Sequence, residues 1–198
     1  MIEGAFKGLK VVDLTQGLAG PFCAMTIAQH GAEVIKIEPP EGDWSRTMGG
    51  AFDDRTPAFV TCNRGKRAIV VNLKSEAGRE VVFKLAATAD VFMESNRAGV
   101  ADRLGIGYAV IKALNPEIVY LSITGFGQQG PYRDRAVTDA IMQAFFGLMT
   151  RNKAADGLPR RIDFAVDDYT TGMMAYQTLQ PPSMGVPWGK VGGIWTSI

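Results

Sequence analysis

Short apolar runs alternate along this chain with longer stretches in which apolar residues recur at helical spacing. The runs are rich in Val, Ile and Leu and are bounded by glycine, proline or polar turns, which is typical of buried strands. They occupy residues 9–14, 31–38, 68–74, 90–94 and 118–123. Helical spacing predicts helices over residues 22–29, 76–87, 109–114 and 138–149, with another helical stretch around Arg103.

The order of these elements predicts the architecture. A strand, a crossover helix and a second strand form a parallel, right-handed βαβ unit, and such units repeat along the chain. The sequence therefore predicts an α/β fold with an open, Rossmann-like sheet that is mostly parallel and has helices on both faces. Residues 41–57 lack periodicity, which predicts a long surface loop.

Composition narrows the class of protein. The chain has 198 residues, of which 46% are hydrophobic and 21% charged, and this predicts one globular domain or a large part of one. A net charge of +1 gives no basic surface for nucleic acid, and no apolar run reaches a membrane-spanning length. Cys23 and Cys62 form neither a disulfide framework nor a metal motif, so we predict two buried thiols, no metal and a cytoplasmic protein.

The turns at the predicted strand ends suggest phosphate binding but not a dinucleotide fold. Gly17 and Gly20 follow the first strand without the Gly-x-Gly-x-x-Gly spacing, so a nicotinamide cofactor is not supported even though Glu38 lies near a ribose-binding position. Basic residues sit in the turn at residues 63–67, at Lys74, and in the polar turn at residues 95–99. They either contact phosphates or are simply solvated.

Two adjacent carboxylates, Asp167 and Asp168, precede the small residues Thr170, Thr171 and Gly172. One interpretation is a nucleophile before a small-residue turn that allows a substrate to approach closely. The other is a helix N-terminus at which acidic side chains cap free amides. The local pattern alone favours the second interpretation.

Four segments in fixed order resemble the family III CoA-transferases, which include formyl-CoA:oxalate and carnitine CoA-transferases. They are residues 18–21 with 31–38, residues 63–74, the Gly-Val-Ala-Asp-Arg-Leu-Gly of residues 99–105, and the Gly-Phe-Gly-Gln-Gln-Gly-Pro-Tyr of residues 125–132. The resemblance covers nearly all of residues 9–179. It implies the N-terminal half of a fold in which two chains interlock as a homodimer.

The resemblance implies a catalytic role for Asp168, because the family places an aspartate four residues before a glycine, here Gly172. That aspartate attacks an acyl-CoA thioester and then carries CoA to a carboxylic acid by covalent catalysis. The partners implied are an acyl-CoA and a small carboxylic acid, with coenzyme A as a substrate and no tightly bound cofactor. Asp167 is the competing candidate, and the spacing to Gly172 favours Asp168.

Further site residues follow from the same resemblance. Gln16 and Asp139 match positions near the acyl group and the nucleophile, and are assigned to substrate binding. Lys74, Arg97 and Arg103 are assigned to coenzyme A; each could instead be a surface ion-pair partner.

The chain also departs from the family pattern. Residues 95–99 read Ser-Asn-Arg-Ala-Gly where the family usually has Asn-Phe-Arg-Pro-Gly, and Asn72 replaces a usual aspartate. The racemase branch of the family has a histidine at the position of Thr138, which cannot act as a base near neutral pH. Since the single histidine, His30, lies elsewhere, racemisation is disfavoured.

The resemblance stops after Leu179. We therefore divide the chain into residues 1–179, part of the large CoA-transferase domain, and residues 180–198, an aberrant tail that contains adjacent prolines and no helical period. Family members are roughly twice as long as this chain, which suggests truncation.

A frameshift would explain the tail. With permissible codons and another reading frame, residues 180–198 can spell Ala-Ala-Leu-Tyr-Gly-Arg-Ala-Met-Gly-Gln-Gly-Gly-Arg-Tyr-Leu-Asp-Val, which resembles the family's continuation. Sequencing the coding DNA tests this hypothesis. We expect this continuation, followed by the rest of the enzyme, in an alternative frame, and its absence there would refute the frameshift.

Overall fold

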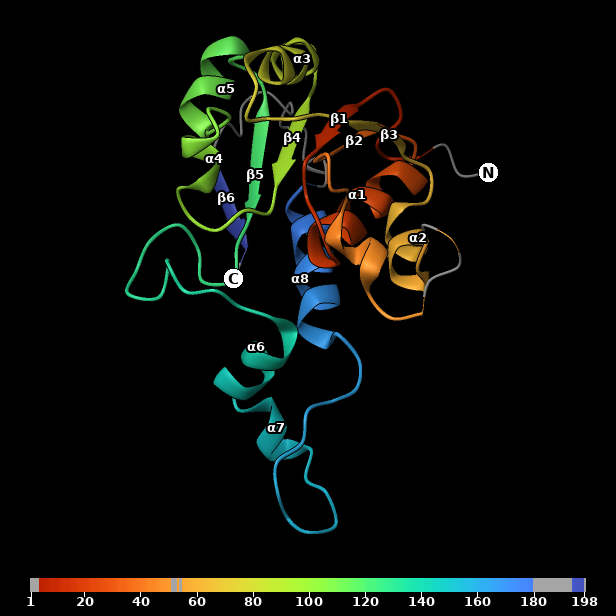
Figure 1. Cartoon of the computed structure of the whole chain (residues 1–198), viewed down its shortest axis with the longest axis vertical. Helices are drawn as coiled ribbons and strands as arrows, with labels where there is room; N and C mark the ends of the chain where they lie inside the picture. Colours follow the sequence, from red (N-terminus) through yellow and green to blue (C-terminus); the bar gives the residue numbers. More distant parts are fainter. Residues whose placement is uncertain (1–3, 51–52, 54, 180–193, 198) are drawn as a thin grey trace.

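The computed structural model describes residues 4–50, 53, 55–179 and 194–197 (Figure 1). A six-stranded sheet in the order β3-β2-β1-β4-β5-β6 forms its centre, and every pair of neighbouring strands is parallel. The strands are β1 (Lys10–Asp13), β2 (Glu33–Glu38), β3 (Arg67–Val70), β4 (Val91–Glu94), β5 (Val119–Ile123) and β6 (Ile194–Ser197). The α/β fold with a parallel sheet, predicted from the sequence, is confirmed.

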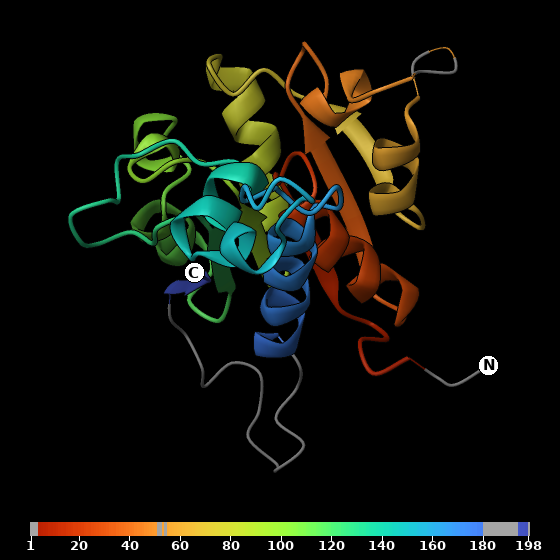
Figure 2. The ribbon, with the colours of Figure 1, turned by 90° about the horizontal axis from the view of Figure 1, so that it is seen from below.

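Helices cover both faces of this sheet. They are α1 (Ala19–Gln29), α2 (Pro57–Asn63), α3 (Glu76–Ala86), α4 (Val100–Arg103), α5 (Tyr108–Leu114), α6 (Asp139–Phe145), α7 (Leu148–Arg151) and α8 (Val166–Thr178), with a 3-10 helix, η1, at Trp44–Thr47. The cores place α1 and α8 on one face and α3, α4 and α5 on the other. Figure 2 shows α8, in blue, beside α1, while α6 and α7 extend away from the sheet in Figure 1.

The alternation of side chains along β4 explains why both faces are covered. Val91 and Met93 belong to the core under α1 and α8, whereas Phe92 belongs to the core under α3 and α5. Successive residues of a strand point to opposite faces, so a strand that is apolar at every position requires a layer on each side. Phe92 and Tyr120 stack with ring centroids 5.2 Å apart in the second core.

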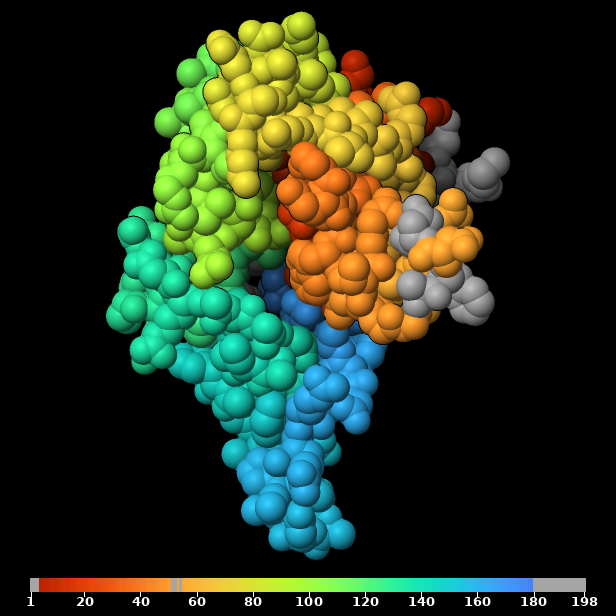
Figure 3. Space-filling view, in the orientation of Figure 1, coloured from red at the N-terminus to blue at the C-terminus, as the bar shows by residue number. Residues whose placement is uncertain are grey.

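The order in which strands are added to the sheet reverses at β1, and this creates a crevice. The segment from β1 to β3 builds outward on one side, and β4 then returns to pair with the other side of β1. The loops that leave β1 and β4 separate at this point, where open parallel sheets bind their ligands. Figure 3 shows a hollow in the facing surface, bordered by orange, yellow and green segments with red at its base.

Helix α8 packs closely against α1, and Gly172 permits this contact. A Cβ atom on Gly172 would lie 2.5 Å from the Ala19 carbonyl oxygen and 3.0 Å from the Phe22 ring. The rings of Phe22 and Tyr169 also meet, with centroids 5.1 Å apart. Farther along both helices, Tyr176 contacts His30. The two helices therefore run in the same direction and begin at the same edge of the sheet.

The structure corrects several sequence predictions. The small residues after Asp168 form the middle of α8 rather than a turn, and Gly172 packs against α1. The helix predicted over residues 138–149 is interrupted at Gly147, whose φ of 75° lies in the left-handed region, and becomes α6 and α7. The strand predicted over residues 68–74 ends at Val70.

The predicted loop at residues 41–57 also has local structure. Asp43 accepts a hydrogen bond from the Ser45 amide and begins η1, and Thr56 caps α2 in the same way through the Phe59 amide. Short helices of this kind give no periodic signal, so the sequence pattern missed them.

Most of the predicted tail lies outside the described residues. Only residues 194–197 of this segment are described, and they form β6 next to β5. The tail was predicted to be aberrant because of its adjacent prolines and lack of helical period, and residues 194–197 at its end pair with the sheet in parallel. The division at residue 179 and the frameshift remain predictions.

Replacing Gly172 with alanine tests the contact between α1 and α8. Alanine normally favours a helix over glycine, but here its Cβ would collide with a backbone carbonyl. We expect Gly172→Ala to lower the free energy of unfolding by about 1–3 kcal/mol. The control is Met173→Ala on the exposed side of α8, which should change stability by less than about 0.5 kcal/mol in the same urea denaturation. Equal stability of the two variants would contradict the close contact.

Candidate active site

Asp168 lies in the first turn of α8, at the edge of the sheet where the parallel strands end. It is one helical turn before Gly172, and residues four apart share a helix face. The side chain of Asp168 therefore lies on the face of α8 that turns toward the start of α1. The predicted nucleophile is thus a half-buried carboxylate at a helix N-terminus.

Asp139 holds the N-terminus of α8 from another helix. Its Oδ2 accepts the Asp167 amide at 2.8 Å and the Asp168 amide at 3.3 Å. The residue at the N-cap position of α8, Ala165, has no side-chain group that could do this. Free amides at a helix start need acceptors, and a carboxylate also complements the helix dipole. The structure thus brings Asp139 next to Asp168, and its contact with substrate remains a prediction.

Gln143 fixes the segment that leads into α8. It is fully buried, and its Oε1 accepts the Ile162 amide at 2.7 Å. Its Nε2 donates to the carbonyl oxygens of Ile162 and Phe164, and to Asp139 Oδ1 at 2.5 Å. One side chain from α6 therefore orients both Asp139 and the chain before the predicted nucleophile. The sequence analysis did not single out Gln143, because a glutamine inside an apolar helix gives no motif.

The environment of Asp168 favours a basic, poorly hydrated carboxylate. Burial, together with the negative charges of Asp139 and Asp167, raises the pKa of Asp168 from 3.8 to about 6. A pKa in this range leaves the carboxylate mostly ionised at neutral pH, yet more basic than a free aspartate. Perturbed carboxylates in a crevice are candidates for catalytic groups.

Asp167 differs from its neighbour. Its pKa is also raised by burial and by Asp139, and its Oδ2 atom is buried without a hydrogen-bond partner among the described residues. It is one residue, or about 100° of helix rotation, away from the face that Asp168 shares with Gly172. Geometry therefore places Asp168 closer than Asp167 to the side of α8 that faces α1.

Gln16 lies in the loop between β1 and α1 at the strand-order reversal. Its backbone amide donates to Ser95 Oγ at 3.0 Å, so the loops that leave β1 and β4 are joined across the crevice. Glu94, buried at the end of β4, accepts the backbone and side-chain N–H groups of Asn96 at 2.8 and 2.9 Å. Burial raises the pKa of Glu94. These contacts order the polar turn that contains Arg97.

The three predicted phosphate-binding residues are exposed. Lys74 follows β3, Arg97 follows β4, and Arg103 is the last residue of α4. The Arg103 guanidinium lies beside Gly99, 3.5 Å from the position that a Cβ atom on this glycine would occupy. None of the three has an acidic partner within salt-bridge distance among the described residues. The surface ion pairs that were the alternative interpretation are therefore not formed within this part of the chain. The cations remain available to an anionic ligand.

The sequence analysis missed a buried charge network beneath this edge. Lys36 Nζ lies 2.7 Å from Asp43 Oδ2, and Lys66 Nζ lies 2.8 Å from Asp13 Oδ2; all four side chains are at most 1% exposed. The Asp13 pKa is lowered, because its charged and polar partners, chiefly Lys66, outweigh the cost of burial. The available signal was a charged residue inside an otherwise apolar strand, such as Lys36 in β2.

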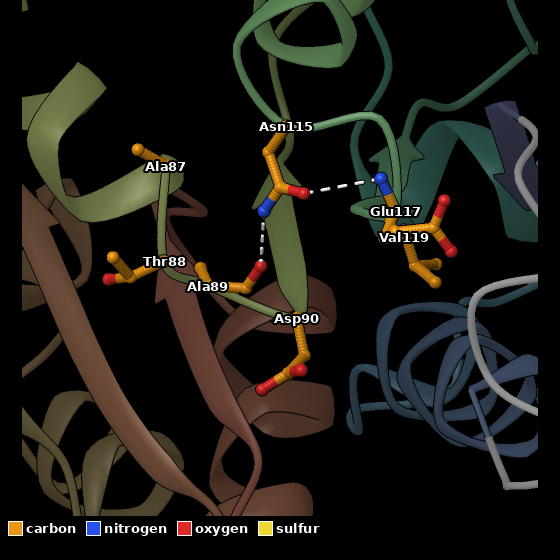
Figure 4. Close-up of a pocket in the computed structure, with 7 residues that line it drawn as sticks. All are labelled: Ala87, Thr88, Ala89, Asp90, Asn115, Glu117 and Val119. Carbon is orange, nitrogen blue, oxygen red and sulfur yellow. Dashed lines mark hydrogen bonds between the residues drawn. The ribbon is translucent and has the colours of Figure 1, made fainter.

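One surface pocket lies at the opposite, amino-terminal edge of the sheet. Figure 4 shows its lining residues, Ala87, Thr88, Ala89, Asp90, Asn115, Glu117 and Val119. The side-chain Nδ2 of Asn115 donates hydrogen bonds to the Ala86 and Ala89 carbonyl oxygens, at 3.0 and 2.8 Å. Asp90 accepts the Lys10 amide at 2.8 Å. The pocket contains none of the predicted site residues, and these polar groups serve the fold.

The two residues that bear on racemisation, His30 and Thr138, both make structural contacts. His30 lies at the far end of α1, roughly 16 Å of helix from the edge that holds Asp168, and contacts Tyr176. Thr138 caps α6 through the Ile141 amide.

Both cysteines are buried and free. Over the described ranges, no helix is long and apolar enough to cross a membrane, and no cluster of His, Cys, Asp and Glu could hold a metal ion.

Comparison with known proteins places the chain among CoA-transferases. The model of the CoA-transferase family III matches residues 6–180. The chain is 44% identical over 172 residues to a succinyl-CoA:glutarate CoA-transferase of Mus musculus, covering 86% of this chain and 39% of that protein. It is also 44% identical over 161 residues to an acetyl-CoA:oxalate CoA-transferase of Acetobacter aceti, covering 81% of this chain and 41% of the relative.

Solved structures are also similar to this chain. A CAIB/BAIF family protein from Brucella suis matches with a TM-score of 0.85 and 41% identity, over 90% of this chain and 48% of that chain. A mutant of a Mycobacterium tuberculosis protein, with one aspartate replaced by alanine, matches with a TM-score of 0.87 and 30% identity, over 96% of this chain and 52% of that one. The chain thus spans about two fifths of these curated relatives and about half of the solved chains.

Substituting Asp168 with asparagine tests the electrostatic environment. The folded-state pKa lies above the unfolded value of 3.8, so the ionised carboxylate destabilises the fold. This cost is absent below about pH 4, develops as pH rises toward 6, and is complete above it. Allowing for solvent screening of a partly exposed group, we expect Asp168→Asn to stabilise the protein by about 1–2 kcal/mol at pH 8 and to have almost no effect at pH 4.

Thermal or urea unfolding at the two pH values measures this difference. Glu80→Gln on the exposed surface of α3 is the matched control and should show no such pH dependence. If Asp168→Asn is equally or less stable at pH 8, the carboxylate is not held in an unfavourable environment.

Proposed function

Because the chain belongs to the CoA-transferase family III, we propose that the protein transfers CoA from an acyl-CoA to a carboxylic acid through an aspartyl intermediate on Asp168. The observation that carries the proposal is the half-buried Asp168 carboxylate at the start of α8, with its pKa raised to about 6 and its backbone held by Asp139. Such a group is ionised at neutral pH but weakly hydrated, as a carboxylate nucleophile must be.

The transfer proceeds in balanced steps. An oxygen of Asp168 attacks the thioester carbonyl carbon, the carbon–sulfur bond breaks, and CoA leaves as a thiolate, so that a mixed anhydride remains. The thiolate then attacks the Asp168 acyl carbon and releases the donor as a carboxylate. Asp168 now carries CoA as a thioester. An acceptor carboxylate repeats these steps in reverse and leaves as the new acyl-CoA.

The surroundings of Asp168 can stabilise the oxyanion that develops in each attack. Helix α1 begins at the same edge of the sheet, and its N-cap residue, Leu18, makes no side-chain hydrogen bond to the first turn. The first-turn amides at Ala19 and Gly20 are therefore suited to receive negative charge. We assign Gln16, in the loop just before them, to contact with the acyl group.

Lys74, Arg97 and Arg103 are the residues we assign to the phosphates of coenzyme A. They are exposed, free of acidic partners among the described residues, and carried by the loops and helix that follow β3 and β4. Arginine can bind a phosphate with two parallel hydrogen bonds, whereas lysine acts as a point charge. Coenzyme A is a substrate in this proposal, and no tightly bound cofactor is required.

A short dicarboxylic acid is the acceptor we favour. The two curated relatives described above are named for glutarate and oxalate.

The alternative function is CoA binding without catalysis. We retain it because the chain covers only about two fifths of the length of these relatives. The homodimer and the cytoplasmic location implied by the sequence are retained as predictions.

Mass spectrometry tests the covalent step. After incubation with succinyl-CoA at pH 7.5, we expect the peptide containing Asp168 to carry an acyl or CoA adduct. Asp168→Ala should abolish the adduct, because the nucleophile is lost, whereas the matched Asp167→Asn variant should retain it within a few-fold. Addition of glutarate or oxalate should discharge the CoA adduct.

Two results would contradict the proposal. CoA binding without any adduct would favour the alternative of a non-catalytic binding protein. An adduct that persists in Asp168→Ala but disappears in Asp167→Asn would identify the other carboxylate as the nucleophile.

A further inference from the structure

In the loop between β1 and α1, the backbone amides of three consecutive residues each donate a hydrogen bond to a side chain. The Thr15 amide donates to Asp13 Oδ1 at 2.9 Å, the Gln16 amide to Ser95 Oγ at 3.0 Å, and the Gly17 amide to Asp43 Oδ1 at 3.0 Å. Backbone donors of a loop usually face water or other backbone groups. Here each one is bound to a side chain from a different position in the fold.

Two of these anchors belong to the buried charge network. Lys36 Nζ donates to the Thr15 carbonyl at 2.8 Å and pairs with Asp43, while Lys66 pairs with Asp13. Buried ion pairs add little net stability, but removing one member leaves a costly unpaired charge. The network therefore fixes the residues on both sides of Gln16 and resists local rearrangement.

Gly17 leaves the loop little freedom. Its φ of 81° lies in the left-handed region, and a Cβ atom there would lie 2.1 Å from the Trp44 ring. The peptide on either side of Gln16 is thus constrained by charge, by backbone conformation and by the indole packed against it. Among the three amides of residues 15–17, the Gln16 amide is the one held from the other half of the sheet, by the Ser95 hydroxyl after β4.

We propose that Ser95 is a positioning residue, which binds the Gln16 amide across the strand-order reversal and so sets the direction in which Gln16 approaches the thioester. This inference rests on the proposed function, because it assigns Gln16 to the acyl group. Ser95 itself does not touch the reacting atoms. The buried ion pairs define where the loop lies, and the Ser95 hydroxyl fixes the orientation of its central peptide.

The removal of one hydroxyl separates positioning from folding. In Ser95→Ala the buried network is intact, so the midpoint of thermal unfolding should stay close to that of the unmodified chain. The Gln16 amide should lose protection, and its hydrogen exchange should become faster. With succinyl-CoA, the maximal rate of adduct formation at Asp168 should fall about tenfold, with little change in the half-saturating concentration.

Two further variants sharpen the test. Ser95→Thr retains the hydroxyl and should restore both the exchange protection and the rate. Thr88→Ala removes a hydroxyl at the opposite edge of the sheet and should leave both unchanged. If Ser95→Ala reacts as fast as the unmodified chain, or Ser95→Thr fails to restore the rate, the positioning role is overturned. If the unmodified chain forms no adduct at all, the proposed function itself fails, and the role of Ser95 fails with it.

Discussion

The contact between Asp139 and the amides of Asp167 and Asp168 is the interaction on which the site depends. It joins α6 to the start of α8, and Gln143 secures it by binding Asp139 and the segment before α8. The same carboxylate satisfies a helix N-terminus and, together with the larger effect of burial, raises the pKa of Asp168. A group that stabilises the backbone thus makes ionisation of the nearby side chain less favourable.

Two parts of the molecule flank this carboxylate: the packed helices α1 and α8, and the anchored loops of the crevice. On one side, α1 approaches α8 closely at Gly172, so that both helices begin at the same edge. On the other, buried charges under β1 and β2, and Glu94 at the end of β4, hold the loops of the crevice. In the proposed function, loops fixed in this way would avoid the entropic cost of placing a thioester within attack distance. The location follows from the parallel sheet, whose order reverses between β1 and β4.

Sequence reasoning recovered what depends on local pattern. The main strands and helices follow from apolar periodicity, and the family follows from the order of several motifs. It failed where contacts between residues distant in sequence determine the local structure. The helix broken at Gly147, the short α2 and the role of Gly172 depend on neighbours that are distant in sequence. The partners of Lys36 could not be read from its strand, although a charged residue inside an apolar run was a visible signal.

A titration of Asp168 shows whether its carboxylate lies in an environment that opposes ionisation. Carbon-13 NMR of its side-chain carboxyl, assigned by comparison with the Asp168→Asn variant, reports the pKa in the intact chain. We expect a midpoint near pH 6, because burial and the carboxylates of Asp139 and Asp167 oppose ionisation. A midpoint near 4, the value of a free aspartate, would contradict it, because the carboxylate would then be solvated and no more basic than any surface acid.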